Sequence, residues 1–244
     1  MSVSNHLPQG RLLPDWQPPS FPAPIDLTGR TVRLAPLDAE KHAAALIQAY
    51  QAGDDEPSWV YLGYGPFANA YDYARWITQA SYESDSRYVA IIDRDKQRPL
   101  GVAALINIRS DDGVLEIGHV HYADALKGTV AATEAQFLLM RHVFALGFRR
   151  VEWKCHALNQ ASRAAAKRLG FRFEGVFRQH RVVKGRNRDT AWFSIIDAEW
   201  PALEAAFETW LRPDNFDPAG RQRQRLSRLT TSASRQNTAE NNDD

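Results

Sequence analysis

One block of the chain, Leu126–Phe171, constrains the fold more than any other part. A helix is predicted to begin at about Val130, within the small-residue start Lys127–Ala132, and a strand and a second helix starting near Asn159 follow it. Gly147 and Gly170 mark the expected ends of the two helices, because glycine is the usual residue beyond a helix C-terminus. A strand before this block, a strand within it and a helix between them predict two parallel strands joined by a crossover.

Hydrophobic periodicity and turn residues predict the elements around this block. Strands are expected at 31–34, 88–92, 100–108, 114–121, 151–155, 173–183 and 190–196, and helices at 38–50, 70–81, 130–146, 160–169 and 199–211. Asp38 is the expected N-cap of the first helix, and turns are expected at 111–113 and 184–188. The predicted fold class is α/β (α+β), a single domain with a mixed, mostly antiparallel sheet of about seven strands and helices on both faces.

The two ends of the chain differ in composition from the middle. Residues 1–28 carry six prolines, which predict an extended lead-in segment. Residues 213–244 are polar and contain few large apolar side chains, which predicts a disordered tail. The folded domain is therefore expected at 29–212.

Charge and cysteine content weigh against several classes of protein. The formal net charge of +1 gives no overall electrostatic case for a nucleic-acid partner, and no apolar run reaches the roughly 18 residues that a membrane span needs. The single cysteine, Cys155, excludes an internal disulfide and a multi-cysteine zinc site, and it favours a reducing compartment. We expect a cytoplasmic protein with no secretory signal, no membrane partner and no metal site.

The start of the helix at 130–146 is the first candidate binding site. The first N–H groups of a helix have no partner within it and lie at its positive end, so they can bind a phosphate. Gly128 permits a positive φ or the close approach of a ligand to the backbone. An ordinary helix N-terminus with small residues is the alternative.

The order and spacing of these segments resemble the GNAT N-acetyltransferase superfamily. The matching runs are Leu115-Glu116-Ile117-Gly118, Leu126-Lys127-Gly128-Thr129-Val130-Ala131-Ala132-Thr133-Glu134-Ala135, Asn159-Gln160-Ala161-Ser162 and Arg168-Leu169-Gly170-Phe171. Within the superfamily the chain is most similar to the RimJ/RimL-like branch, the ribosomal-protein N-acetyltransferase type. The resemblance covers roughly Thr31–Trp200, and the block 114–171 is its specific part.

The resemblance implies acetyl-CoA as cosubstrate, bound at a central splay of the sheet. The pantetheine arm would run between the strands at 114–121 and 151–155, and Asn159 would hydrogen-bond it, with a role as N-cap as the equal alternative. Val130 departs from the family pattern of Gly or Ala, so we expect a somewhat reshaped loop and a weaker affinity for CoA. The diphosphate would lie on the backbone N–H groups of Lys127, Gly128, Thr129, Val130, Ala131 and Ala132.

Acyl transfer to an amine needs a group that accepts a proton, and Glu116 is the first candidate. It alternates with Leu115 and Ile117, and the resemblance places an acid at this position. A salt bridge across the sheet is the alternative role. His121 is the second candidate base, although period-two geometry places His119 and His121 on the face of Leu115 and Ile117.

Two further groups are needed for the same chemistry. Ser162 is the candidate that protonates the leaving thiolate, with simple exposure as the alternative. The backbone N–H groups of residues 118–120 are candidates for stabilising the oxyanion. Cys155 is expected to be a small buried strand residue and not a nucleophile.

The predicted function is an acetyl-CoA-dependent N-acetyltransferase that transfers an acetyl group to a primary amine by direct transfer in a ternary complex. The amine would belong to a protein N-terminus or a small molecule, and a homodimer is left open. A catalytically inactive CoA-binding or peptide-binding module with the same fold is the alternative. The basic turn 184–188 is either a solvated turn or a contact for an acidic acceptor or the cofactor's 3′-phosphate, and the aromatic run 59–67 is either core or a wall of the acceptor pocket.

Overall fold

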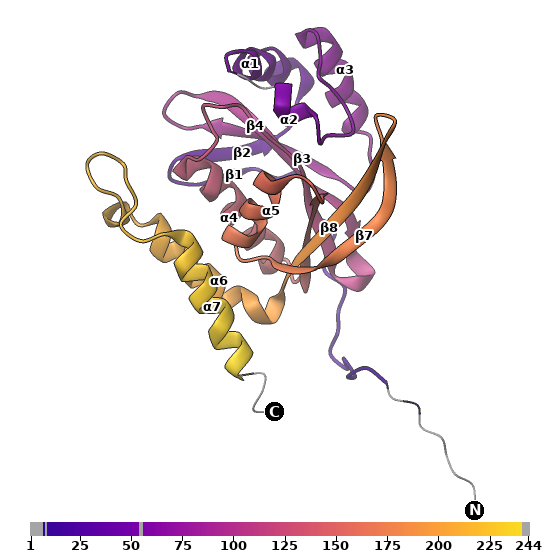
Figure 1. The fold of residues 1–244 in the computed structure, drawn as a ribbon, viewed down its shortest axis with the longest axis vertical. Helices are drawn as coiled ribbons and strands as arrows, with labels where there is room; N and C mark the ends of the chain where they lie inside the picture. Colours follow the sequence, from indigo (N-terminus) through magenta and orange to yellow (C-terminus); the bar gives the residue numbers. More distant parts are fainter. Residues whose placement is uncertain (1–6, 8, 54–55, 241–244) are drawn as a thin grey trace, which may run out of the picture.

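An eight-stranded sheet runs through the computed structural model, which describes residues 7, 9–53 and 56–240 (Figure 1). The strands are β1 (Leu27–Thr28), β2 (Val32–Pro36), β3 (Arg87–Asp93), β4 (Arg98–Arg109), β5 (Val114–Tyr122), β6 (Arg150–His156), β7 (Arg172–Val183) and β8 (Arg186–Ile196). Their spatial order is β1-β2-β3-β4-β5-β6-β8-β7, and every neighbouring pair is antiparallel except β5 and β6. The expected fold class and the parallel pair are therefore confirmed.

Helices cover both faces of the sheet, as expected. One face carries α1 (Ala39–Gln51), α2 (Glu56–Trp59) and α3 (Ala70–Ala80), and the other carries α4 (Val130–Ala145), α5 (Gln160–Arg168), α6 (Trp200–Leu211) and α7 (Leu226–Glu240). The larger core lies around Phe137, Phe193 and Phe207, and a smaller aromatic core packs α1, α3 and Trp59 against β3 and β4. No helix in the described ranges is long and apolar enough to cross a bilayer.

Side-chain caps explain where four of these helices begin. In each case an oxygen of the N-cap side chain accepts the N–H group three residues further on, which satisfies a donor that the helix itself cannot use. The expected cap at Asp38 is confirmed, with Lys41 N–H at 3.0 Å. The other caps are Asn69 for α3, Thr129 for α4 and Asn159 for α5.

The lead-in segment lies against the folded domain. Residues 9–26 contain no helix or strand, and the chain then passes into β1 at Leu27, two residues before the expected start of the domain. Ile25 is buried in the larger core, and the Arg87 Nε atom donates to the Pro22 carbonyl at 2.9 Å. Residues 1–6 and 8 of the predicted lead-in lie outside the described residues.

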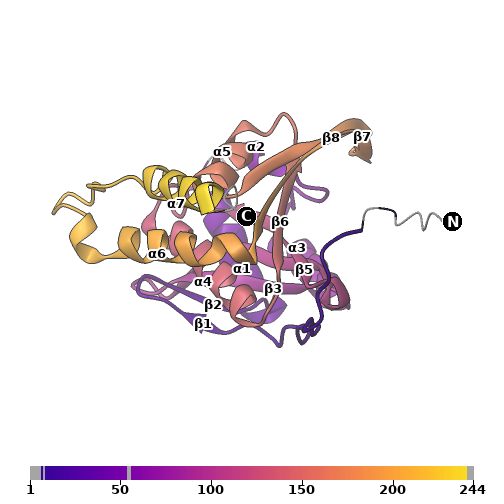
Figure 2. The same cartoon turned by 90° about the horizontal axis from the view of Figure 1, so that it is seen from below.

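The expectation of a disordered tail at 213–244 is wrong, because most of the described part of this segment is helical. Residues 226–240 form α7, which lies alongside α6 (Figure 2). Leu226, Thr230 and Ala233 are buried, and their spacing of four and three residues places them on one helix face. Composition alone missed this helix because a few apolar residues at helical spacing are enough to dock it. Residues 241–244 of the predicted tail lie outside the described residues.

We expect Leu226→Ala to lower the free energy of unfolding by about 2–5 kcal/mol, because truncating a buried leucine leaves a cavity. Leu226 is 1 % exposed and belongs to the larger core. Urea unfolding measures the change, with Ser227→Ala at the neighbouring exposed position as a control that should leave the midpoint unaltered. Equal midpoints for Leu226→Ala and the wild type would contradict the docking of α7.

The β7–β8 hairpin is longer and its turn tighter than expected. β8 begins at Arg186, so the predicted turn at 184–188 is wrong and the connection consists of Lys184 and Gly185. Both have positive φ, 49° and 70°, as a two-residue turn between twisted strands requires. The tip of this hairpin reaches toward α2, where the Lys184 Nζ atom donates to the Trp59 carbonyl at 2.8 Å (Figure 1).

Two β-bulges interrupt the pairing of β4 with β5. Asn107 on β4 and His119 on β5 each have a φ of 50°, and the register of the two strands shifts at both places. A bulge adds a residue to one strand and changes which face the following side chains occupy. As a result, His119 and His121 contact the aromatic groups of the smaller core, on the face of Glu116. Their expected placement on the opposite face is wrong.

Candidate active site

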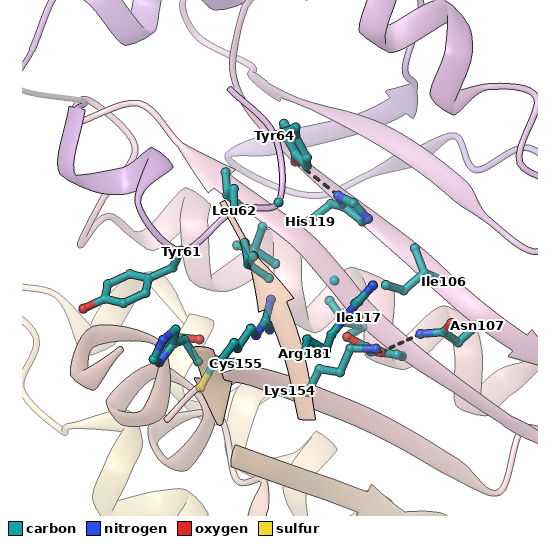
Figure 3. A pocket seen from close by; sticks show the side chains of 18 of the residues that line it. Tyr61, Leu62, Tyr64, Ile106, Asn107, Ile117, His119, Lys154, Cys155 and Arg181 are labelled. Carbon is teal, nitrogen blue, oxygen red and sulfur yellow. Dashed lines mark hydrogen bonds and ion pairs between the residues drawn. The ribbon is translucent and has the colours of Figure 1, made fainter. Parts of the chain in front are cut away.

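A cleft of about 670 Å³ lies where β5 and β6 separate (Figure 3). The two strands pair only from Val114 opposite Arg150 to Glu116 opposite Glu152. Beyond that point residues 117–120 and 153–156 form two walls of the cleft, and the segments 61–64 and 181–184 line its other sides. The inner edges of both strands beyond the last pair therefore have backbone groups that no neighbouring strand satisfies.

Glu116 lies in the cleft and is 2 % exposed. Its Oε2 atom accepts hydrogen bonds from Asn107 Nδ2 and from Lys154 Nζ, both at 2.7 Å. Burial raises the pKa of Glu116 above its ordinary value, while the charge and hydrogen bond of Lys154 oppose this. The salt bridge across the sheet that was the alternative role of Glu116 is therefore present, with Lys154 as its partner. In the described part of the chain no hydrogen bond involves Oε1, so this oxygen is available to a water or an amine.

Gly118 keeps the space beside this carboxylate open. A Cβ atom at position 118 would lie 3.3 Å from Glu116 Oε1 and 2.5 Å from the Ile106 side chain. The same position carried a sequence signal, because an isolated glycine within a strand pattern often marks a bulge. That signal could have placed His119 correctly.

Asn107 and Lys154 were not predicted as site residues. The bulge at Asn107 turns its amide toward Glu116, and nothing in the alternation of β4 indicates this. The sequence does contain a signal for Lys154, because it follows Glu152 by two residues and therefore shares its face. Finding it required the register that sets Glu152 opposite Glu116.

His119 lines the cleft as a neutral ring. Its Nδ1 atom lies 3.2 Å from Tyr64 Oη, and burial lowers the pKa of His119 to about 4. Burial also raises the pKa of Tyr64, so this hydroxyl stays protonated at neutral pH. The two rings stack, with centroids 5.4 Å apart. The aromatic run at 59–67 is therefore both core, through Trp59, and cleft wall, through Tyr64.

His121 is not brought to Glu116. Its ring lies between those of Tyr50 and Trp59, with centroids 4.2 and 4.0 Å away, in the smaller core. Among the described residues, those that line the cleft do not include His121. The structure therefore gives no support to His121 as a second base.

We expect acid to destabilise the fold through His119. Between pH 6.5 and pH 4 an unfolded histidine binds a proton and this half-buried one does not, so stability falls as pH falls, by up to about 3 kcal/mol. Urea unfolding at pH 7 and pH 4.5 should show a larger loss for the wild type than for His119→Gln. Identical losses in the two proteins would contradict a neutral imidazole at His119.

Asn159 and Ser162, at the start of α5, also line the cleft. Asn159 Oδ1 accepts the Ser162 N–H group at 3.0 Å, so its role as an N-cap is confirmed. Ser162 Oγ accepts a hydrogen bond from Trp153 Nε1 at 3.0 Å and lies beside the Cys155 thiol, whose pKa burial raises. The cavity thus contains Ser162 and Glu116 together, on two different walls.

The start of α4 offers backbone donors to a ligand, although fewer than predicted. Hydrogen bonds within the protein already use the N–H groups of Lys127, Thr129 and Ala132. The hydrogen bonds of the described chain do not use the N–H groups of Gly128, Val130 or Ala131. These three groups can therefore bind an anion.

The geometry of this loop fits a diphosphate. The positive φ falls on Gly128, at 72°, and Val130 begins α4 as an ordinary helical residue, so the expected strain at Val130 is absent. A Cβ atom at Gly128 would meet nothing within 4 Å, which leaves open space beside the loop. The Lys127 Nζ atom donates to Ser58 Oγ at 2.8 Å, and Ser58 lines the cleft, so the loop borders the cavity that contains Glu116.

A helix start with unused N–H groups lies beside a cleft between two diverging parallel strands. This arrangement is able to hold a phosphate-bearing group whose reactive end lies in the sheet. The acetyltransferase (GNAT) domain model matches residues 31–172. The chain belongs to this family.

Solved structures and a curated relative are similar to the chain. A GCN5-related N-acetyltransferase from Brucella melitensis is 46% identical, with a TM-score of 0.87, over 90% of this chain and 100% of that one. A probable acetyltransferase of the GNAT family from Chromobacterium violaceum is 42% identical, with a TM-score of 0.75, over 80% and 98% of the two chains. The uncharacterized N-acetyltransferase p20 of Bacillus licheniformis is 26% identical over 57% of this chain and 80% of its own length.

Proposed function

We propose that the protein is an acetyl-CoA-dependent N-acetyltransferase that acts on a primary amine by direct transfer in a ternary complex. The observation that carries the proposal is a buried carboxylate, Glu116, with one oxygen free, in a cleft that the loop at the start of α4 reaches through the Lys127–Ser58 hydrogen bond. Acetyl-CoA would supply an acetyl thioester. The N–H groups of Gly128, Val130 and Ala131 would hold its diphosphate, and the free edges of β5 and β6 would hold its pantetheine arm.

The side chains of the cleft account for the proton transfers. The acceptor nitrogen attacks as the neutral amine, and Glu116 Oε1 accepts its proton directly or through a water as the C–N bond forms. When the C–S bond breaks, a hydroxyl on the opposite wall, that of Ser162 or Tyr61, returns a proton to the thiolate. The cationic groups of Lys154 and Arg181 lower the pKa of a nearby amine and so favour its neutral form.

The assignment to the RimJ/RimL-like branch belongs to this proposal as well. It is supported by the runs 126–135 and 159–162, which the structure places at the helix start and at the cleft wall. A cytoplasmic location is likewise proposed, on the basis of the single buried cysteine.

Incubation of the purified protein with acetyl-CoA and a panel of amines tests the function. We expect one free thiol for each acetylated amine, measured by a thiol reagent and by mass spectrometry. The intact mass of the protein should stay unchanged during turnover, because no acetyl group passes through the enzyme. Binding of acetyl-CoA without turnover of any amine would favour the inactive CoA-binding module.

A further inference from the structure

Two arginines face each other across the β7–β8 hairpin at the cleft. Arg181 lies directly opposite Arg188 in the register of the two strands, and both line the cavity that contains Glu116. Figure 3 shows the Arg181 side chain inside the cleft, next to Lys154 and Ile117. The hairpin thus places two guanidinium groups beside the candidate proton acceptor.

Neither guanidinium has an anionic partner within the described chain. No ion pair or hydrogen bond of the described residues involves Arg181 or Arg188, and the Arg188 Nε atom is buried without a partner. Burial and the charge of Arg181 lower the pKa of Arg188. By contrast, Arg150 pairs with Glu152 and Glu174 on the same sheet. In the described part of the chain Glu116 pairs with Lys154 and with neither arginine.

Arg181 is exposed, whereas the Nε atom of Arg188 is buried, so an anion between them would relieve the repulsion and supply the missing partner of Arg188. Like charges directly opposite each other on neighbouring strands repel, and a buried guanidinium donor without a partner loses its hydration. Two planar guanidinium groups match the two oxygens of a carboxylate through paired hydrogen bonds. The cofactor's diphosphate is not the anion that the two arginines bind, because its proposed site, Gly128–Ala131, lies outside the cleft lining.

We propose that the acceptor is a small molecule that carries a carboxylate besides its amine, and that Arg181 and Arg188 bind this carboxylate. The inference rests on the proposed function and names the class of substrate for the same site. A cleft of about 670 Å³ has room for such a molecule together with the end of the pantetheine arm. With its carboxylate on the hairpin, the acceptor presents its amine to Glu116 Oε1 in the same cleft.

Matched pairs of acceptors test the inference. Amino acids are compared with their carboxamides, and aminoalkyl phosphates with the corresponding amino alcohols, at saturating acetyl-CoA. We expect kcat/KM to be at least about tenfold higher for the carboxylates than for the carboxamides, given the strength of charge-assisted hydrogen bonds. Arg188→Gln should remove this preference by raising KM for the carboxylates more than KM for the carboxamides, without raising KM for acetyl-CoA.

Arg186→Gln is the matched control, because Arg186 lies on the same strand but is exposed outside the cleft lining, so the preference should persist. Turnover of carboxamides and carboxylates with equal kcat/KM would overturn the inference and leave the proposed function intact. A preference for phosphates alone, or a raised KM for acetyl-CoA in Arg188→Gln, would also overturn it. Turnover of none of the amines would refute the proposed function and the inference together.

Discussion

Replacing Glu116 by glutamine should lower kcat/KM for the amine by about two to four orders of magnitude, the usual contribution of a positioned base. Glutamine has the same shape and can still accept the hydrogen bonds of Asn107 and Lys154, but it cannot take up a proton. The defect should therefore appear in turnover, while the affinity for acetyl-CoA in a calorimetric titration stays near that of the wild type.

The activities of the wild type and of Glu116→Gln should depend differently on pH. The carboxylate must be ionised to act as a base, and burial raises its pKa, so wild-type activity should fall as pH falls through a value above 4.5. Glu116→Gln should lack this acid limb. Glu152→Gln is the control, because Glu152 is also buried and ion-paired on the neighbouring strand but lies outside the cleft lining. Full activity in Glu116→Gln would exclude Glu116 as the proton acceptor.

Gly128→Glu should weaken acetyl-CoA binding by about ten- to a hundredfold, because it places a negative charge beside the proposed diphosphate site. Gly128 has a φ of 72°, so any larger side chain strains the loop, and strain alone could reduce affinity. Gly128→Lys carries the same strain with the opposite charge and serves as the matched control.

Comparison of the two Gly128 variants separates charge from backbone strain. We expect Gly128→Lys to bind acetyl-CoA more tightly than Gly128→Glu, with the difference shrinking as salt screens the charges. Equal dissociation constants for the two variants, or no dependence on salt, would place the diphosphate elsewhere on the protein.

Local signals in the sequence predicted the elements that build the site. A role as N-cap was one of the two roles expected for Asn159, because its amide can accept a helix N–H group, and the crossover from 114–121 to 151–155 required parallel strands. Each of these depends on a short stretch of chain, and the structure confirms both. The period-two pattern of β5 likewise placed Glu116 opposite the apolar side chains of Leu115 and Ile117.

The parts that were missed depend on contacts between distant segments. His119 changed face because of a bulge, which is set by the pairing of β4 with β5 and not by the residues of β5 alone. Lys154 became the partner of Glu116 through the register of the parallel strands. The helix α7 forms because Leu226 and Ala233 pack against the larger core. The polar composition of the tail does not reveal that such a packing surface exists elsewhere in the protein.

A crystal structure of the protein with CoA would locate both ends of the bound cofactor. We expect diphosphate oxygens about 2.7–3.2 Å from the backbone nitrogens of Gly128, Val130 and Ala131, the distance of an N–H···O hydrogen bond. We also expect the thiol between β5 and β6, in the cleft that contains Glu116. A CoA molecule bound with its diphosphate away from the start of α4, or with its thiol outside this cleft, would refute the proposed cofactor site.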